Sequence, residues 1–352
     1  MPRLVIFERD ARAHLALVAV ALLVSLGTGV GASAQPLPRV HLLTTGGTIA
    51  GGAGGSLGAD DFLRLVPGLA TVARVTAEDF INVGSSRMTP EIQSRLATRV
   101  NELLRTNPDL AGIVITHGTD SLEETAFLLD LIVPPGRPVV FAAAQRPPRE
   151  TDTDGPRNLL NAVRVAASPA ARDAGVLVTL NDEVHAALEV RKTHAVAVDA
   201  FKSPWMGPVG WVDAGRVVMM HKPLRHLTLA PTAVEPRVDL LTLVAGSDGH
   251  LERAAVAAGA RGLVVEVFGR GNVPPPVMEA VKEARAKGVV VVFTTRTRGG
   301  RVEIDEAARA LGVVAGQDLD GLKARTLLVA ALGVTRDVAA IQRYVDTLAG
   351  RP

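Results

Sequence analysis

The sequence contains no cysteine and very few aromatic residues. Only 3% of its 352 residues are Phe, Trp or Tyr, and the single tyrosine is Tyr344. Without cysteine the chain can form no disulfide, even in an oxidising compartment. Because aromatic side chains are scarce, Ala, Val and Leu must fill the hydrophobic core. Stability must then come from the size of that core and from any oligomer that the chain forms.

An excess of charge of one sign is also missing. The chain has 38 Lys and Arg against 36 Asp and Glu, for a formal net charge of +2, and the basic residues alternate with acidic ones. This pattern disfavours partners such as nucleic acids or an anionic membrane surface and predicts a mixed, solvated surface. A length of 352 residues with 47% hydrophobic residues predicts two globular domains.

The N-terminus has the three parts of a secretory signal peptide. Arginines at positions 3, 9 and 12 precede an apolar run from Leu15 to Leu26, and the small residues Ala32–Ala34 follow. The apolar run is short for a membrane span, which needs about 20 residues, so an uncleaved anchor is the weaker alternative. We expect cleavage near Ala34 and a periplasmic or secreted mature chain with no membrane segment.

After residue 35, apolar segments alternate with helical ones. Strands are expected at 40–43, 112–115, 139–142 and 176–179, and helices at 90–105, 121–131 and 158–166. Thr89 is placed to cap the first helix, and Ser121–Glu124 fits a capping box. Strands that alternate with helices predict an α/β fold with a mainly parallel sheet and flavodoxin-like or Rossmann-like layers.

A proline-rich stretch interrupts this alternation between residues 201 and 237. It contains a predicted hairpin around 213–215 and an interdomain linker at roughly 222–237. A smaller α/β unit is expected to follow, with strands at 240–243, 262–267 and 289–294 and helices at 276–286, 322–332 and 337–347. The predicted organisation is a signal peptide at 1–34, an N-terminal catalytic domain at 35–230 and a C-terminal domain at 231–352.

Two polar, glycine-rich loops leave predicted strand ends. Thr44–Gly51 contains three hydroxyls and two adjacent glycines, which permit a tight turn and close approach to a ligand. This loop alone also fits a simple turn or a phosphate-binding loop, although it lacks the Lys of a P-loop and G-x-G-x-x-G spacing. The second loop is Thr116–Asp120, between a predicted strand and a predicted helix. Taken singly, its Thr119 and Asp120 would be helix-capping residues.

Together the loops bring hydroxyls and a carboxylate to adjacent strand ends, where ligands bind in open parallel sheets. This is a set of groups suited to nucleophilic acyl transfer, provided that a base is present. Lys192 is the candidate base, since a lysine in a partly buried polar site can accept a proton. Taken alone, Lys192 would be interpreted as a solvated surface residue.

These motifs resemble those of the bacterial-type L-asparaginases, in the asparaginase/glutaminase family. Thr45–Gly51 is similar to the first signature of that family and Ile115–Ala126 to the second, while Asp154–Leu159 and Lys323–Arg325 match further stretches. The resemblance covers about residues 38–352, and the signal peptide is typical of the periplasmic type II branch.

The resemblance implies hydrolysis of the side-chain amide of L-asparagine to L-aspartate and ammonia. Some members of the family also hydrolyse L-glutamine. The resemblance also implies that the enzyme uses no metal or organic cofactor, and that it is a homotetramer with active sites between subunits. By position, Thr48 matches the nucleophile, and Thr119, Asp120 and Lys192 match the proton-transfer group.

Further positions match substrate contacts of the family. Ser85 corresponds to the residue that binds the α-carboxylate, Asp120 to the carboxylate that binds the α-ammonium, and Ala144 to a backbone carbonyl near the leaving amide. Backbone N–H groups of the two loops, around Gly47 and Gly118, are suited to hold the developing oxyanion.

The sequence departs from the family at three places. Members of the family usually have a tyrosine in a mobile lid after the first signature, where it helps to activate the nucleophile. The corresponding residues 52–60 contain no tyrosine. In addition, Ser86 stands where many members have Gln. For the carboxylate that a partner subunit supplies, Glu303, Asp305 and Asp248 are alternatives, each of which also fits a surface carboxylate. The sequence therefore leaves open the activation of Thr48 and the preference for asparagine or glutamine.

Competing interpretations are a glutaminase-asparaginase of mixed specificity and, in another class, a periplasmic amino-acid-binding protein with impaired turnover. An amidotransferase-associated subunit is disfavoured by the signal peptide.

Overall fold

The structure is a computed structural model that describes residues 36–51, 57–224 and 226–349. From Pro38 onward the chain forms one compact unit. The expected signal peptide at 1–34 and residues 52–56 of the expected lid lie outside the described residues. Over the described ranges, no helix is both long and apolar enough to span a bilayer.

The larger sheet has eight strands in the order β10-β9-β6-β5-β4-β3-β1-β2. The strands from β2 to β5 in this order are parallel, and β6, β9 and β10 are antiparallel. Their bounds are β1 Arg39–Thr44, β2 Arg74–Asp79, β3 Leu110–Thr116, β4 Val139–Ala142, β5 Val176–Leu180, β6 Glu183–Ala186, β9 Gly210–Asp213 and β10 Arg216–Met219. A separate two-stranded ladder pairs β7 Arg191–Lys192 with β8 Phe201–Lys202.

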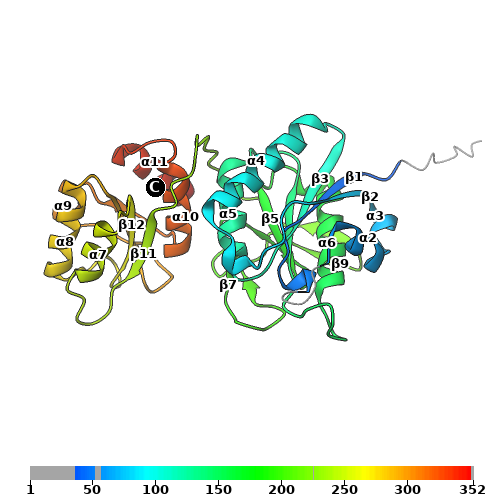
Figure 1. The fold of residues 1–352 in the computed structure, drawn as a ribbon, viewed down its shortest axis with the longest axis horizontal. Helices are drawn as coiled ribbons and strands as arrows, with labels where there is room; N and C mark the ends of the chain where they lie inside the picture. The colour runs from blue at the N-terminus through cyan, green and yellow to red at the C-terminus, as the bar shows by residue number, and fades with distance from the viewer. Residues whose placement is uncertain (1–35, 52–56, 225, 350–352) are drawn as a thin grey trace, which may run out of the picture. The chain divides into compact units, whose positions relative to one another are not determined.

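Helices cover both faces of this sheet, as Figure 1 shows. The helices α2 Ala59–Leu65, α3 Leu69–Val72 and α6 Gly155–Ala167 pack on one face, and α4 Pro90–Thr106 and α5 Leu122–Ile132 on the other. In β1, Leu42 joins the core under α6, and the next residue, Leu43, joins the core under α4 and α5. Because both faces are buried here, two consecutive residues of β1 are apolar, in place of strict alternation.

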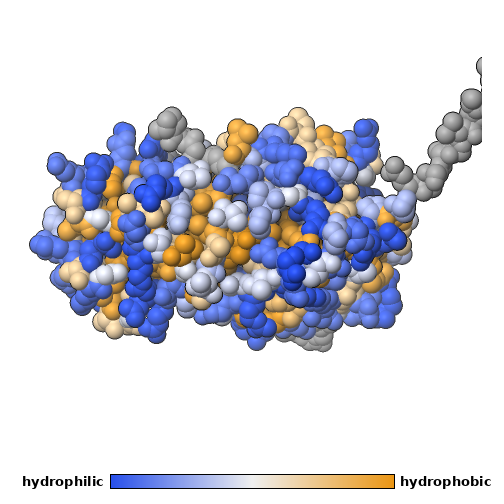
Figure 2. All heavy atoms as spheres, turned by 90° about the horizontal axis from the view of Figure 1, so that it is seen from above, coloured by the Kyte–Doolittle hydropathy of each residue, from blue (hydrophilic) through white to orange (hydrophobic). Residues whose placement is uncertain are grey.

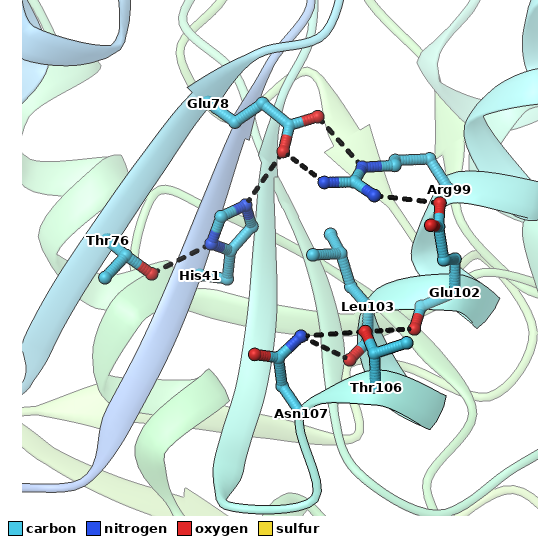
Figure 3. Close-up of polar contacts among 8 residues, drawn as sticks. All are labelled: His41, Thr76, Glu78, Arg99, Glu102, Leu103, Thr106 and Asn107. Atoms are coloured by element: carbon cyan, nitrogen blue, oxygen red, sulfur yellow. Dashed lines mark hydrogen bonds and ion pairs between the residues drawn. The ribbon is translucent and has the colours of Figure 1, made fainter.

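Helix α4 is anchored to the edge strand β2 by a cluster of polar side chains (Figure 3). Arg99 donates Nε to Glu78 Oε1 at 2.9 Å and Nη2 to Glu78 Oε2 at 2.6 Å. On β1, His41 bonds to Thr76 through Nδ1 at 2.8 Å and approaches Glu78 through Nε2 at 3.6 Å. Burial lowers the pKa of His41. The side chains of β2 are exposed or only partly buried, so little apolar packing holds this edge strand. The polar contacts therefore contribute to fixing it against β1 and α4.

The smaller sheet contains four parallel strands in the order β11-β12-β13-β14. Helix α10 shares one apolar cluster with α5, which includes Leu328 and Val329 of α10 and Phe127 and Leu131 of α5. The elements of this half are β11 Val238–Thr242, α7 His250–Ala257, β12 Gly262–Val267, α8 Pro275–Ala286, β13 Val290–Thr295, α9 Glu306–Ala310, β14 Val314–Ala315, α10 Gly321–Ala331 and α11 Val338–Ala349. The α/β fold with a larger N-terminal and a smaller C-terminal parallel sheet is thus confirmed.

Several local predictions are confirmed and one is wrong. Thr89 caps α4 by accepting the N–H of Ile92 at 3.4 Å, and β9 and β10 form the expected hairpin. The capping box at Ser121 is wrong, because that side chain makes no cap hydrogen bond and Glu124 pairs with Arg325 instead. Strand β2 was not predicted because its residues are polar and only partly buried.

Figure 2 shows hydrophilic and apolar residues interspersed over the face drawn. This matches the mixed surface that the balanced charges predict.

Candidate active site

The two threonine loops leave neighbouring strands at the same end of the larger sheet. Strands β1 and β3 are parallel and in register, with Thr44 opposite Thr116 at their carboxyl ends. Strand β4 lies on the other side of β3, with Ala142 opposite Thr116. The loops after these three strands are therefore adjacent, as predicted for ligand binding at strand ends.

The loops approach so closely that only glycine fits between them. A Cβ atom on Gly47 would lie 2.4 Å from both Cα and N of Gly118, and Gly47 has φ +84°. A Cβ on Gly118 would lie 2.6 Å from Ser85 Oγ. No real Cβ tolerates such distances, so these glycines place the backbones of three loops against one another.

The three threonines of the first loop have different environments. Thr44 donates its hydroxyl to Asp79 Oδ1 at 2.6 Å, and Thr45 donates to the carbonyl of Thr116 at 2.7 Å. Thr48 begins the short helix η1 Thr48–Ala50 and is half-buried. Among the described residues, none forms a hydrogen bond with the Thr48 hydroxyl. Of the three, Thr48 alone has a hydroxyl that no described residue engages, which leaves it available for chemistry.

The second loop places its threonine against the predicted base. Lys192 Nζ donates to Thr119 Oγ1 at 2.8 Å, and the same ammonium lies 3.5 Å from Asp120 Oδ1. Thr119 is 5% exposed, whereas the Asp120 side chain is 62% exposed. The arrangement brings together three of the four predicted catalytic residues, although Lys192 lies 73 positions after Thr119.

Ser85 joins a third loop to the second one. It begins the short helix η2 Ser85–Arg87, and its hydroxyl accepts the backbone N–H of Asp120 at 3.0 Å. Its carbonyl accepts a hydrogen bond from the Ser121 hydroxyl at 2.6 Å. The Ser121 side chain, expected to cap α5, therefore bonds to Ser85 instead. Ser86 is exposed. Ser85 thus lies beside Gly118 and Asp120, and its role in binding the α-carboxylate stays a prediction.

The loop after β4 carries Ala144, which is fully buried. Asp154 holds this loop by accepting the backbone N–H of Gln145 at 3.1 Å and of Arg146 at 2.9 Å. Asn158 adds a bond from Nδ2 to the carbonyl of Ala143 at 2.9 Å. The stretch Asp154–Leu159, which resembles the family, had no role suggested by the sequence alone. In the structure its side chains fix the loop that follows β4.

Two residues of the second motif that sequence reasoning did not single out are buried within it. His117 is fully buried, and burial lowers its pKa to about 4, while Nδ1 lies 2.7 Å from the Gly118 carbonyl. Glu123 accepts the backbone N–H of Lys192 at 3.3 Å, and burial raises its pKa. In the sequence, both are marked only by their position inside the second signature, Ile115–Ala126.

The three candidates for a cross-subunit carboxylate each have a local partner. Asp305 caps α9 by accepting the N–H of Ala308 at 2.8 Å, and Glu303 pairs with Arg270. Asp248 accepts the N–H of His250 at 3.0 Å. None of the three contacts the threonine loops through a hydrogen bond within the described residues.

A cavity of about 430 Å³ opens beside Lys192. Charged residues of both signs line it, among them Asp120, Glu123, Arg191 and Asp320. No group of His, Cys, Asp and Glu that could hold a metal ion is found in the described ranges.

Comparisons with known proteins point to one family. The model described as "Asparaginase, N-terminal" matches residues 39–225, and that of the "Glutaminase/Asparaginase C-terminal domain" matches residues 237–345. The chain is 37% identical to an L-asparaginase 2 of Bacillus subtilis, covering 89% of this chain and 87% of the relative. A probable periplasmic L-asparaginase of Haemophilus influenzae is 36% identical, over 94% and 99% of the two chains.

A relative with a broader name is the glutaminase-asparaginase of Pseudomonas fluorescens. It is 35% identical, covering 87% of this chain and 90% of the relative. Among solved structures, a probable cytoplasmic L-asparaginase from Campylobacter jejuni superposes with a TM-score of 0.83 at 35% identity. That match covers 88% of this chain and 99% of the other.

Proposed function

This chain belongs to the asparaginase family, and on that premise we propose that it hydrolyses the side-chain amide of L-asparagine to L-aspartate and ammonia. The observation that carries the proposal is the contact of Lys192 Nζ with Thr119 Oγ1 at 2.8 Å. Thr119 follows Gly118 and Thr48 follows Gly47, the two glycines at which the loops approach each other. These groups supply a nucleophile and a proton carrier on adjacent loops.

In the proposed reaction, the Thr48 hydroxyl attacks the amide carbon. Backbone N–H groups around Gly47 and Gly118 stabilise the negative oxygen that forms. The C–N bond then breaks, the nitrogen takes up the proton lost by Thr48, and ammonia leaves an acyl-enzyme ester. Water attacks this ester, returns the proton to Thr48 and releases L-aspartate. Lys192 and Thr119 form the hydrogen-bonded pair that carries protons in both steps.

The amino-acid part of the substrate would be held by the surrounding loops. The exposed carboxylate of Asp120 is available to pair with the α-ammonium group, and the Ser85 and Ser86 hydroxyls to bind the α-carboxylate. The backbone carbonyl of Ala144 would accept a hydrogen bond from the leaving amide. This assignment requires no metal or organic cofactor.

L-Glutamine is the second candidate substrate. The observation that favours it is the similarity to glutaminase-asparaginases, such as that of Pseudomonas fluorescens. The short side chain of Ser86 leaves more room at the α-carboxylate end than a glutamine residue would. A glutaminase-asparaginase would release ammonia from both substrates.

Export and assembly belong to the same proposal. We infer that residues 1–34 direct the chain to the periplasm, as the name of the Haemophilus influenzae relative suggests, while the Campylobacter jejuni neighbour is described as cytoplasmic. We place the boundary between domains at roughly 222–237. A homotetramer would bring Glu303, Asp305 or Asp248 of one subunit to the threonine loops of another.

The test is ammonia release by the purified mature protein from L-Asn, L-Gln and D-Asn. We expect release from L-Asn, with the L-Gln rate deciding between asparaginase and mixed specificity. Isothermal titration with the same amino acids runs beside it. Tight binding without any ammonia release would instead support an amino-acid-binding protein. Light scattering during gel filtration measures whether the mature chain is a tetramer.

A further inference from the structure

The strand that carries Lys192 is tied to the C-terminal half of the chain. Arg191, its neighbour in β7, lies with Nε 2.7 Å from Asp320 Oδ2, and Nη1 donates to the carbonyl of Arg298 at 2.8 Å. The Arg191 and Asp320 side chains are only 16% and 9% exposed. Ion pairs at such burial are held in one geometry and are weakly screened by salt.

Asp320 performs two tasks with its two oxygens. While Oδ2 pairs with Arg191, Oδ1 accepts the backbone N–H of Lys323 at 2.9 Å and so caps α10. One carboxylate therefore fixes the start of α10 and the direction of Arg191 together.

The same helix also reaches the other side of Lys192. Lys323 is 2% exposed, and its Nζ donates to the carbonyls of Glu123 at 3.0 Å and Ala187 at 2.7 Å. Glu123 in turn accepts the backbone N–H of Lys192 at 3.3 Å. Through Lys323, α10 holds the first turn of α5, which holds the main chain at Lys192.

Strand β7 is short. It contains two residues, and within the described ranges its one strand partner is β8, with Lys192 opposite Phe201. Backbone bonds at its two ends join Thr193 N to the Ala200 carbonyl at 2.7 Å and Val190 N to the Ala186 carbonyl at 3.0 Å. A shift of its backbone would carry Lys192 Nζ away from Thr119 Oγ1. The contacts made by Arg191 and Glu123 add to these backbone bonds in fixing the strand against the second loop.

We propose that Asp320 and Arg191 are positioning residues that hold Lys192 against Thr119, so that helix α10 of the same chain is part of the apparatus for proton transfer. This inference rests on the proposed function, in which the Lys192–Thr119 pair carries protons. It assigns to the C-terminal half a role within its own subunit.

A second ion pair provides a matched control. Glu124 and Arg325 join the same two helices, α5 and α10, with Nη1 3.2 Å from Oε2 and with side chains that are partly buried, 22% and 24% exposed. Among the described residues, neither forms a hydrogen bond or ion pair with β7. If the Arg191–Asp320 pair serves stability alone, loss of either ion pair should have the same effect on kcat. Positioning predicts that only the Arg191–Asp320 pair affects turnover.

The experiment compares Asp320→Asn with Glu124→Gln, each of which replaces a carboxylate by an amide of equal size. Asparagine still caps a helix, so α10 is retained in the first variant. We expect kcat on L-Asn to fall by about 10- to 100-fold in Asp320→Asn, with KM within twofold, since small misplacements have effects of this size. Glu124→Gln should keep the wild-type kcat even where Tm falls.

A readout independent of activity is the rate at which acetic anhydride modifies Lys192, measured by mass spectrometry. Lys282, which is 63% exposed on α8, is the internal reference. Modification of Lys192 should become several-fold faster in Asp320→Asn and stay unchanged in Glu124→Gln. Arg191→Lys, which keeps the charge, should restore part of the protection that Arg191→Leu loses.

The outcomes separate the two proposals. If wild type releases no ammonia from any substrate, the proposed function fails, while the modification rates still report the position of Lys192. Equal modification rates in wild type and Asp320→Asn, or equal losses of kcat in the two amide variants, would overturn the positioning role. If Asp320→Asn does not fold, the Arg191→Leu and Arg191→Lys pair decides by the same measurement.

Discussion

The two threonine loops contain the same kind of side chain in opposite environments. Thr119, in the second loop, is buried and its hydroxyl accepts a hydrogen bond from Lys192. Thr48, in the first loop, is half-buried and receives no hydrogen bond from the described residues. Both lie at the ends of neighbouring parallel strands, so the difference does not come from the fold class.

The difference arises from the segments that adjoin each loop. The second loop faces β7, which brings a lysine, whereas the first loop leads into residues 52–56, which lie outside the described ranges and contain no tyrosine. The proposed function gives the two threonines different roles, with Thr119 as a partner for proton transfer and Thr48 as the attacking group.

The largest effect is expected for Thr48→Ala. If Thr48 forms the acyl-enzyme, kcat on L-Asn should fall by about 10⁴-fold or more, as for other nucleophiles. Thr44→Val is the matched control, because the Thr44 hydroxyl is engaged with Asp79. It should lower stability by about 1 kcal/mol and leave most of the turnover. Full activity in Thr48→Ala would remove Thr48 as the nucleophile.

A smaller effect is expected in the second loop. Thr119→Val and Lys192→Met should each lower kcat by about 10²- to 10³-fold, the usual size of general acid–base contributions. Because the two residues act as one unit, the double variant should be little worse than either single one. Circular dichroism checks the fold of each variant.

Lys202→Met on the adjacent strand β8 is the control for this pair, since Lys202 bonds to Glu183 rather than to Thr119. It should keep kcat within about twofold, as expected for a surface ion pair. Additive losses in the double variant, or wild-type rates in either single variant, would contradict the proposed unit.

The smallest effect concerns pH. His117 titrates with a pKa of about 4 in the folded chain, because burial disfavours its charged form, against 6.5 for the free side chain. The unfolded chain therefore binds more protons between these values, so the free energy of unfolding falls as pH drops from 6.5 to 4. The full contribution is on the order of 3 kcal/mol.

The measurement is Tm against pH for wild type and His117→Asn. The variant should show a flatter rise of Tm between pH 4 and 6.5. Some slope should persist in the variant, because burial also lowers the pKa of His185 to about 4. If the Tm curves of wild type and His117→Asn run parallel between pH 4 and 6.5, the lowered pKa of His117 does not contribute to acid sensitivity.

Much of the fold could be predicted because its signals are local. The central strands are apolar runs such as Leu110–Thr116, and Thr89 with Pro90 marks the start of α4. Strand β2 and the ladder β7–β8 could not be predicted, since β2 is polar and partly buried and β7 has two residues. The capping box failed because Ser121 found a better partner in the carbonyl of Ser85.

The candidate reactive groups and the loops that present them can be identified from the amino-acid order, because Gly47, Gly118 and the threonines lie within a few residues of predicted strand ends. The contact between Lys192 and Thr119 arises on folding, because it joins residues 73 positions apart. The contact of Lys323 with Glu123, through which α10 supports the segment at Lys192, spans 200 positions. Such contacts depend on the packing of distant elements, which no local pattern encodes.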